Sequence, residues 1–159
     1  MQVNARPTFE TTVLPKLLRQ YVRTGHVRIE QRLLAFIGPD SVRGRNAALA
    51  AGLQSKQYNL STLLYANQGT ENTGWLDENM VVKAAASIPG LRVPQMLTDA
   101  KSSQVADKAK AFDDEATASG VSSTPTILVG KTGGKLTTVT MSSPTDYESV
   151  SAAITNALG

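Results

Sequence analysis

The sequence contains no cysteine and a single histidine, His26. Without cysteine, the chain can form no disulfide and offers neither a thiolate metal ligand nor a cysteine nucleophile. One histidine cannot build a histidine metal cluster. Its place between Gly25 and a strand-like run predicts a solvated loop residue and not a member of a Ser-His-Asp triad. We therefore expect no metal site and no cofactor.

Aromatic residues and long apolar runs are also scarce. Aromatic side chains make up 5% of the sequence, and no apolar stretch approaches the roughly 18 residues that cross a bilayer. This predicts that the chain does not span a membrane. The opening stretch MQVNARPTFETTVLPK lacks the apolar core of a signal peptide. As given, the chain is therefore expected in the cytoplasm, or as a fragment whose export signal has been removed.

Positive charge is concentrated in the first part of the chain. Residues 1–60 carry nine Lys or Arg against three acidic residues, whereas the remainder has a net charge of −3. A basic half can indicate nucleic-acid binding. Here the charges alternate with apolar residues, and no aromatic side chains lie between them as stacking platforms. We expect a solvated basic face and no nucleic-acid partner.

The hydrophobic period changes several times along the chain. Residues 8–25 have apolar side chains at helical spacing and end at a glycine, which predicts an amphipathic helix. Residues 26–36 alternate like a strand. The pattern from 41 to 119 is helical throughout. Two short strand-like runs then enclose a glycine-containing turn, and a last helix ends the chain.

This order of elements predicts an α/β fold with one large helical insertion. Residues 1–40 and 120–159 are expected to form the two parts of one domain. Residues 41–119 form the inserted helical domain.

The stretch GVSSTPTILVG, residues 120–130, places Pro125 at the entry of an apolar, β-branched run. Proline cannot donate a ladder hydrogen bond, so in sheets it is confined to edges, bulges or the first residue of a strand. A trans proline opening an ordinary edge strand is one interpretation. The resemblance described next gives another.

Together with VLPKLLRQYVRTGHVRI and GPDSVRGRNAALAAGLQSKQYNLSTLLYANQGTENTGW, this stretch resembles the DsbA-like thiol-disulfide oxidoreductase family of the thioredoxin superfamily. The resemblance implies a thioredoxin-like sheet, a helical insertion, and thiol-disulfide exchange in exported proteins of bacterial type, hence an extracytoplasmic location. It also implies a cis Thr124-Pro125 bond. Thr124 and Pro125 would bind an extended or unfolded polypeptide by strand addition.

Two features of that family are absent from this sequence. The family needs a Cys-x-x-Cys pair at the start of its first helix, where the helix dipole lowers the thiol pKa. Its cysteines would fall at Val3 and Arg6, where VNAR stands instead, so we expect a redox-inactive chain with no catalytic residue. The central strand that precedes the helix is also missing. The sequence therefore resembles an N-terminally truncated member of the family.

Without a central strand, two apolar strands would have unpaired backbone groups facing the gap. Residues 26–36 could pair directly with residues 126–130, a second chain could supply the strand, or the N-terminal tail could fill the gap. We expect the second arrangement, a strand-exchanged homodimer.

Three functions remain open from the sequence. The chain could be a piece of a DsbA-like oxidase whose activity needs the missing parts. It could be a non-catalytic domain that binds peptides, as a chaperone-like or scaffold module, through the Thr124-Pro125 loop. It could also be a basic helical module for acidic partners. We favour a DsbA-like domain that is catalytically incompetent as given.

Overall fold

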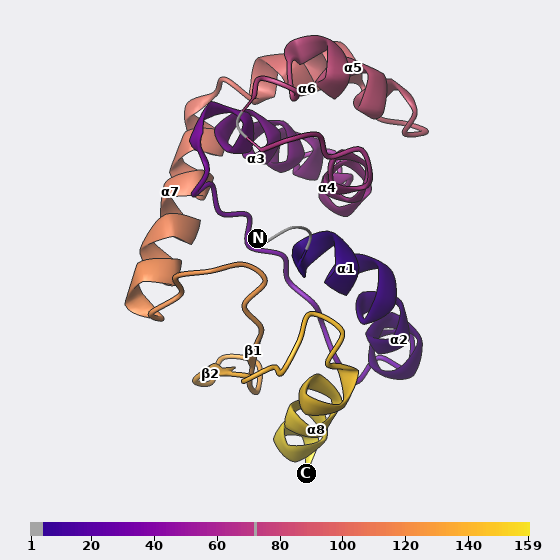
Figure 1. The fold of residues 1–159 in the computed structure, drawn as a ribbon, viewed down its shortest axis with the longest axis vertical. Coiled ribbons are helices and arrows are strands. Elements are labelled where there is room, and N and C mark those ends of the chain that lie inside the picture. The colour runs from indigo at the N-terminus through magenta and orange to yellow at the C-terminus, as the bar shows by residue number, and fades with distance from the viewer. Residues whose placement is uncertain (1–4, 72) are drawn as a thin grey trace. The chain divides into compact units, whose positions relative to one another are not determined.

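The computed structural model describes residues 5–71 and 73–159, which form two compact units. The first unit contains the chain up to residue 30 and residues 121–159, and the second contains residues 31–120 (Figure 1). The predicted insertion, 41–119, lies inside the second unit. Leu33, which precedes the predicted insertion, packs into the core of the second unit. No helix that the structure describes is long and apolar enough to cross a membrane.

The first unit opens with a helical segment that is interrupted twice. It consists of α1 (Ala5–Thr12), α2 (Leu14–Leu17) and the π-helical turn η1 (Leu18–Val22). Pro15 lies at the start of α2, where its missing N–H is tolerated. Gly25 ends the segment with a φ of 78°, a left-handed conformation that glycine adopts readily. The predicted helix is therefore present, although it is interrupted between α1 and α2, next to Pro15.

Residues 27–36, predicted as most of a strand, have no regular secondary structure. The alternation nevertheless predicts burial correctly: Val27 and Ile29 are half-buried, Arg28 and Glu30 are exposed, and Leu33 is buried. A strand also requires a neighbouring strand with which it exchanges backbone hydrogen bonds. The sheet among the described residues contains only β1 and β2, so residues 27–36 have no such neighbour. The strand prediction was wrong because side-chain alternation reports burial and not backbone pairing.

The two strands of the hairpin in the first unit are shorter than the strand-like runs of the sequence. Strand β1 (Leu128–Val129) pairs antiparallel with β2 (Thr137–Thr138), with Leu128 opposite Thr138 and Val129 opposite Thr137. Both β2 threonines are exposed, so burial of apolar side chains contributes little to stabilising a longer strand there. Direct pairing of 26–36 with 126–130, one of the expected alternatives, is not found among the described residues.

Gly130 closes β1 where the two arms of the hairpin approach most closely. A Cβ atom at this position would overlap the backbone oxygen of Lys135, which cannot move aside as a flexible side chain can. We expect Gly130→Ala to reduce the free energy of unfolding by about 1–3 kcal/mol, the range for an overpacked site. Urea unfolding measures this loss, with Lys131→Ala at an exposed neighbouring position as the control. Equal stability of the two variants would contradict this assignment.

Helix α8 (Tyr147–Leu158) packs on the N-terminal helices and is capped by Asp146. Its Val150 and Ile154 share a core with Phe9, Val13 and Leu17. The Asp146 carboxylate accepts a hydrogen bond from the backbone N–H of Ser142 at 2.8 Å and of Ser149 at 3.0 Å. The hydroxyls of both serines donate to it as well, each at 2.8 Å.

These hydrogen bonds, led by the one from the Ser142 N–H, lower the pKa of Asp146 well below its ordinary value. A lowered folded-state pKa stabilises the fold above the unfolded pKa, near 3.9, and this contribution is lost as the pH falls toward the folded value. We expect Asp146→Asn to keep the helix cap. Its stability should fall less than that of the parent as the pH is lowered through this acid range. Thermal unfolding from pH 6 to pH 2 measures it. An unchanged acid dependence in the variant would contradict the assignment.

The second unit is a bundle of five helices (Figure 1). They are α3 (Gly38–Gly52), α4 (Gln57–Ala66), α5 (Glu78–Ala86), α6 (Val93–Asp99) and α7 (Ser103–Ala118). Asp77 and Ser102 cap α5 and α7 by accepting hydrogen bonds from backbone N–H groups. The alanine run at the end of α3 is fully buried, which lets the neighbouring helices pack closely on it. The helical pattern of the sequence is confirmed here.

Candidate functional site

The predicted binding loop leads directly into β1. The Thr124–Pro125 peptide bond is cis, the isomer that the resemblance implies. Ser122, Ser123 and Thr124 are exposed, and the hydroxyl of Thr126 holds the turn by donating to the Ser123 carbonyl at 2.7 Å. Among the described residues, Thr124 has no hydrogen-bond partner. Its backbone N–H and C=O are therefore available to another chain.

The edge of β1 continues this surface. The N–H of Val139 donates to the carbonyl of Ile127 at 2.8 Å, so Ile127 and Val129 direct their backbone groups toward β2. In an antiparallel ladder successive residues point their backbone groups to opposite sides. The N–H and C=O of Leu128 therefore point away from β2. Within the described part of the chain, no second strand pairs with this edge.

The apolar core of the first unit holds this edge in place. Ile127 and Val129 pack against a core built from α1, α2 and α8. Polar contacts join η1 to α8: the Tyr21 hydroxyl lies 2.6 Å from the Ser151 hydroxyl, and the Tyr147 hydroxyl donates to Gln20. Hydrogen bonding to Ser151 lowers the pKa of the Tyr21 phenol. These contacts hold α8 against η1, and Ile127 and Val129 pack on the core to which both elements contribute.

The two family cysteine positions fall at the very start of the chain. Val3 lies outside the described residues, and Arg6 lies in α1, where only its backbone is described. No cysteine occurs anywhere in the sequence.

Some of the basic residues noted in the sequence form ion pairs. In the second unit, Arg32 pairs with Glu115 at 2.7 Å and Arg45 pairs with Asp113 at 2.9 Å, both acidic residues of α7. His26 is exposed and contacts the Thr24 hydroxyl. No cluster of potential metal ligands occurs among the described residues.

Sequence reasoning found the loop but missed the outward edge at Leu128. That edge depends on which of two alternating residues faces β2, and therefore on register. Register is set by pairing across the hairpin and is not visible in a run such as TILVG.

Comparison with known proteins places this geometry in a wider group. A family model described as thioredoxin matches residues 7–156. The chain is 28% identical over 125 residues to a probable disulfide bond formation protein D from Bacillus cereus, and 26% identical to the corresponding protein from Bacillus anthracis. Each match covers 77% of this chain and 58% of the relative, so the chain spans less than two thirds of the length of these relatives.

The fold also matches a solved structure, the oxidised form of BdbD from Bacillus subtilis. The TM-score is 0.79 at 17% identity, and the match covers 96% of this chain and 80% of that one. This likeness confirms the thioredoxin-like fold with a helical insertion, although the sheet described here has two strands only.

Proposed function

Because this chain belongs to the thioredoxin family, in its DsbA-like branch, we propose that it is a polypeptide-binding domain that carries out no thiol-disulfide exchange by itself. Two observations carry the proposal: Thr124 is exposed and has no hydrogen-bond partner among the described residues, and the backbone groups of Leu128 point away from β2 on a strand that packs on the core of the first unit. Its ligand is an extended or unfolded polypeptide.

Strand addition is the mode of binding that this surface supports. An extended peptide lying along β1 would exchange hydrogen bonds with Leu128 and Thr124, while Pro125 has no N–H to satisfy. Main-chain hydrogen bonds supply affinity with little dependence on sequence. Such a ligand is therefore an unfolded segment and not one defined peptide.

The names of the relatives support a cysteine-containing polypeptide as the ligand and a location outside the cytoplasm. The curated relatives are named as disulfide bond formation proteins, and forming a disulfide requires a polypeptide that contains cysteine. We place the domain outside the cytoplasm, where disulfides form and persist. Without cysteine these 159 residues can hold an unfolded substrate but cannot exchange electrons with it.

The proposal is tested by removing one backbone donor. Thr124→Pro deletes the Thr124 N–H, whereas Thr124→Ala keeps it and changes only the side chain. We expect the proline variant to bind a fluorescently labelled, reduced and carboxymethylated polypeptide at least tenfold more weakly, and the alanine variant to bind like the parent. Fluorescence anisotropy measures both, and circular dichroism verifies that both fold. Equal binding by both variants would overturn strand addition at this loop.

A further inference from the structure

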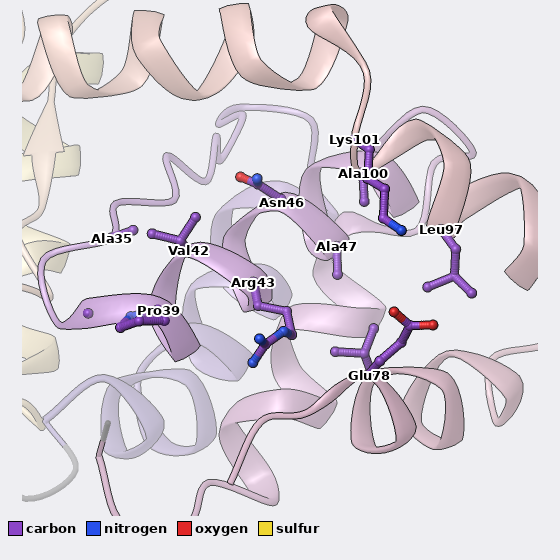
Figure 2. Close-up of a pocket in the computed structure, with 12 residues that line it drawn as sticks. Ala35, Pro39, Val42, Arg43, Asn46, Ala47, Glu78, Leu97, Ala100 and Lys101 are labelled. Carbon is purple, nitrogen blue, oxygen red and sulfur yellow. The ribbon is translucent and has the colours of Figure 1, made fainter. Parts of the chain in front are cut away.

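The net positive charge of the chain lies in its first unit. That unit contains seven Lys or Arg residues against four acidic residues, whereas the second unit contains nine of each, so the net charge of +3 belongs to the first unit. Opposite charges also share surfaces in the second unit. Figure 2 shows one example, a pocket beside α3 whose lining includes Arg43 and Lys101 as well as Glu78. The first unit is therefore the part of the chain that attracts anions.

Three cations of the first unit lie on one exposed surface. They are Lys16 in α2, Arg19 in η1, and Arg23, which directly follows η1. We call this the α2–η1 surface. Leu17 and Tyr21 of the same segment are buried in the core of the unit, so the cations lie on the other side. Spacings of three and four residues make them neighbours, and at 1.5 Å per residue they span about 10 Å.

The charge of the α2–η1 surface is not neutralised within the described part of the chain. There, Lys16, Arg19 and Arg23 take part in no ion pair. Two acidic residues of the unit have other partners, because Asp146 caps α8 and Glu30 pairs with a neighbouring arginine. An anionic partner can therefore bind to this surface without displacing an ion pair.

The helix dipole accounts for only part of this surface. Arg19 lies in the last turn of the helical segment and Arg23 directly follows it, where the partial negative charge of a helix C-terminus favours cations. Lys16 lies before that turn, and the effect of the dipole falls off within the last turn. A stabilising role in the helix therefore does not explain the position of Lys16.

Helix α8 holds part of the α2–η1 surface in place. The Lys16 amine lies 5.3 Å from the centre of the Tyr147 ring, and the Tyr147 hydroxyl donates to Gln20. The Gln20 amide donates in turn to the Tyr21 hydroxyl at 3.4 Å. Side chains that are already ordered lose less conformational entropy on binding. The surface is therefore partly organised before a ligand arrives.

The number and spacing of the cations favour one class of partner. Polybasic segments that attract anionic membranes contain about four to eight Lys or Arg. Strong, salt-dependent binding to DNA involves about six to ten contacts with phosphates. Three cations are fewer than is usual for either. Acidic residues at alternate positions of an extended segment lie about 7 Å apart on one side, so an acidic segment of a few residues matches the length of this surface.

We propose that the α2–η1 surface binds an acidic segment of another protein, whose carboxylates pair with Lys16, Arg19 and Arg23. The planar guanidinium of arginine suits this ligand, because it can donate two parallel hydrogen bonds to one carboxylate. The proposal does not depend on the proposed function. Strand addition at β1 recognises backbone groups, whereas this surface recognises charge. Because the surface is exposed, we expect its affinity to fall as salt is added.

The test uses an eight-residue peptide in which glutamate alternates with serine, and a twin with glutamine in place of glutamate. Backbone amide NMR signals of residues 16–23 report binding at low ionic strength. We expect the glutamate peptide to shift these signals and the glutamine peptide to leave them unchanged. Equal shifts with the two peptides overturn recognition of charge.

A matched pair of variants keeps the test specific. Arg19→Gln with Arg23→Gln removes two charges from the α2–η1 surface, and Lys83→Gln with Arg92→Gln removes two charges from exposed positions of the second unit. We expect at least a fivefold loss of affinity for the glutamate peptide in the first variant and less than a twofold loss in the second, with both folded by circular dichroism. Equal losses overturn the surface, because they reflect net charge alone.

Other anions and the other binding edge supply the remaining outcomes. Vesicles that contain phosphatidylglycerol and an oligomer of thymidylate are tested with the same variants. Tighter binding of either one than of the peptide, with the same dependence on Arg19 and Arg23, overturns the acidic protein segment as the partner. Peptide-induced shifts confined to Thr124 and Leu128 overturn the α2–η1 surface and leave the proposed function intact.

Discussion

The purified 159-residue chain is expected to show no disulfide reductase, oxidase or isomerase turnover. Thiol-disulfide exchange requires a thiolate that attacks a disulfide sulfur, and the only sulfur in this sequence belongs to its four methionines. A thioether has no proton to lose and cannot form the mixed disulfide. The rate with a dithiol peptide or a disulfide-linked substrate should therefore equal the rate in buffer alone.

The matched control is the double variant Val3→Cys and Arg6→Cys, which restores the family spacing at the start of the first helical segment. We expect it to gain little activity unless a strand preceding the helix is also supplied, because the family geometry places the cysteines at the end of that strand. Turnover by the cysteine-free chain, prepared free of contaminating oxidoreductase, would contradict the first expectation. Full activity of the double variant alone would contradict the second.

The second large effect concerns assembly: we propose that two copies of the chain associate through the outward edge of β1. The N–H and C=O of Leu128 point away from β2, and an exposed strand edge is a template for pairing with another chain. The half-buried Ile127, Val129 and Ile29 would be covered by such pairing. Leu33, which follows in the same apolar segment, is already buried in the core of the second unit and takes no part.

Light scattering after size exclusion, across a dilution series, measures this association. We expect the mass of a dimer at high micromolar concentration and a decrease toward the monomer on dilution. An unfolded polypeptide should promote dissociation, because it competes for the same edge. A single monomeric mass at high micromolar concentration would contradict the proposal.

The sequence predicts those parts of the fold that depend on local pattern. The helices of the second unit follow from their helical apolar pattern. Burial along 27–33 also follows from alternation. The backbone state of that segment does not, because a strand is defined by a neighbour that can be distant in sequence.

The candidate sites divide in the same way. The loop at Thr124 and Pro125 is predictable because proline and β-branched residues in that order restrict the backbone locally. The outward edge at Leu128 requires the hairpin register. A pocket beside α3 is lined by Ala35, Glu78 and Lys101, and these residues are brought together only by the packing of the second unit. Such packing leaves no signal in a single sequence.

Hydrogen exchange at the Leu128 amide is the measurement that tests polypeptide binding by strand addition most directly. It is followed by NMR at a protein concentration where light scattering gives the monomer mass, with and without the carboxymethylated polypeptide. We predict that the polypeptide slows exchange of the Leu128 N–H, because that group gains a hydrogen-bond acceptor, while the Val139 N–H, already bonded to Ile127, changes little. Unchanged exchange at Leu128 with saturating polypeptide would contradict the account.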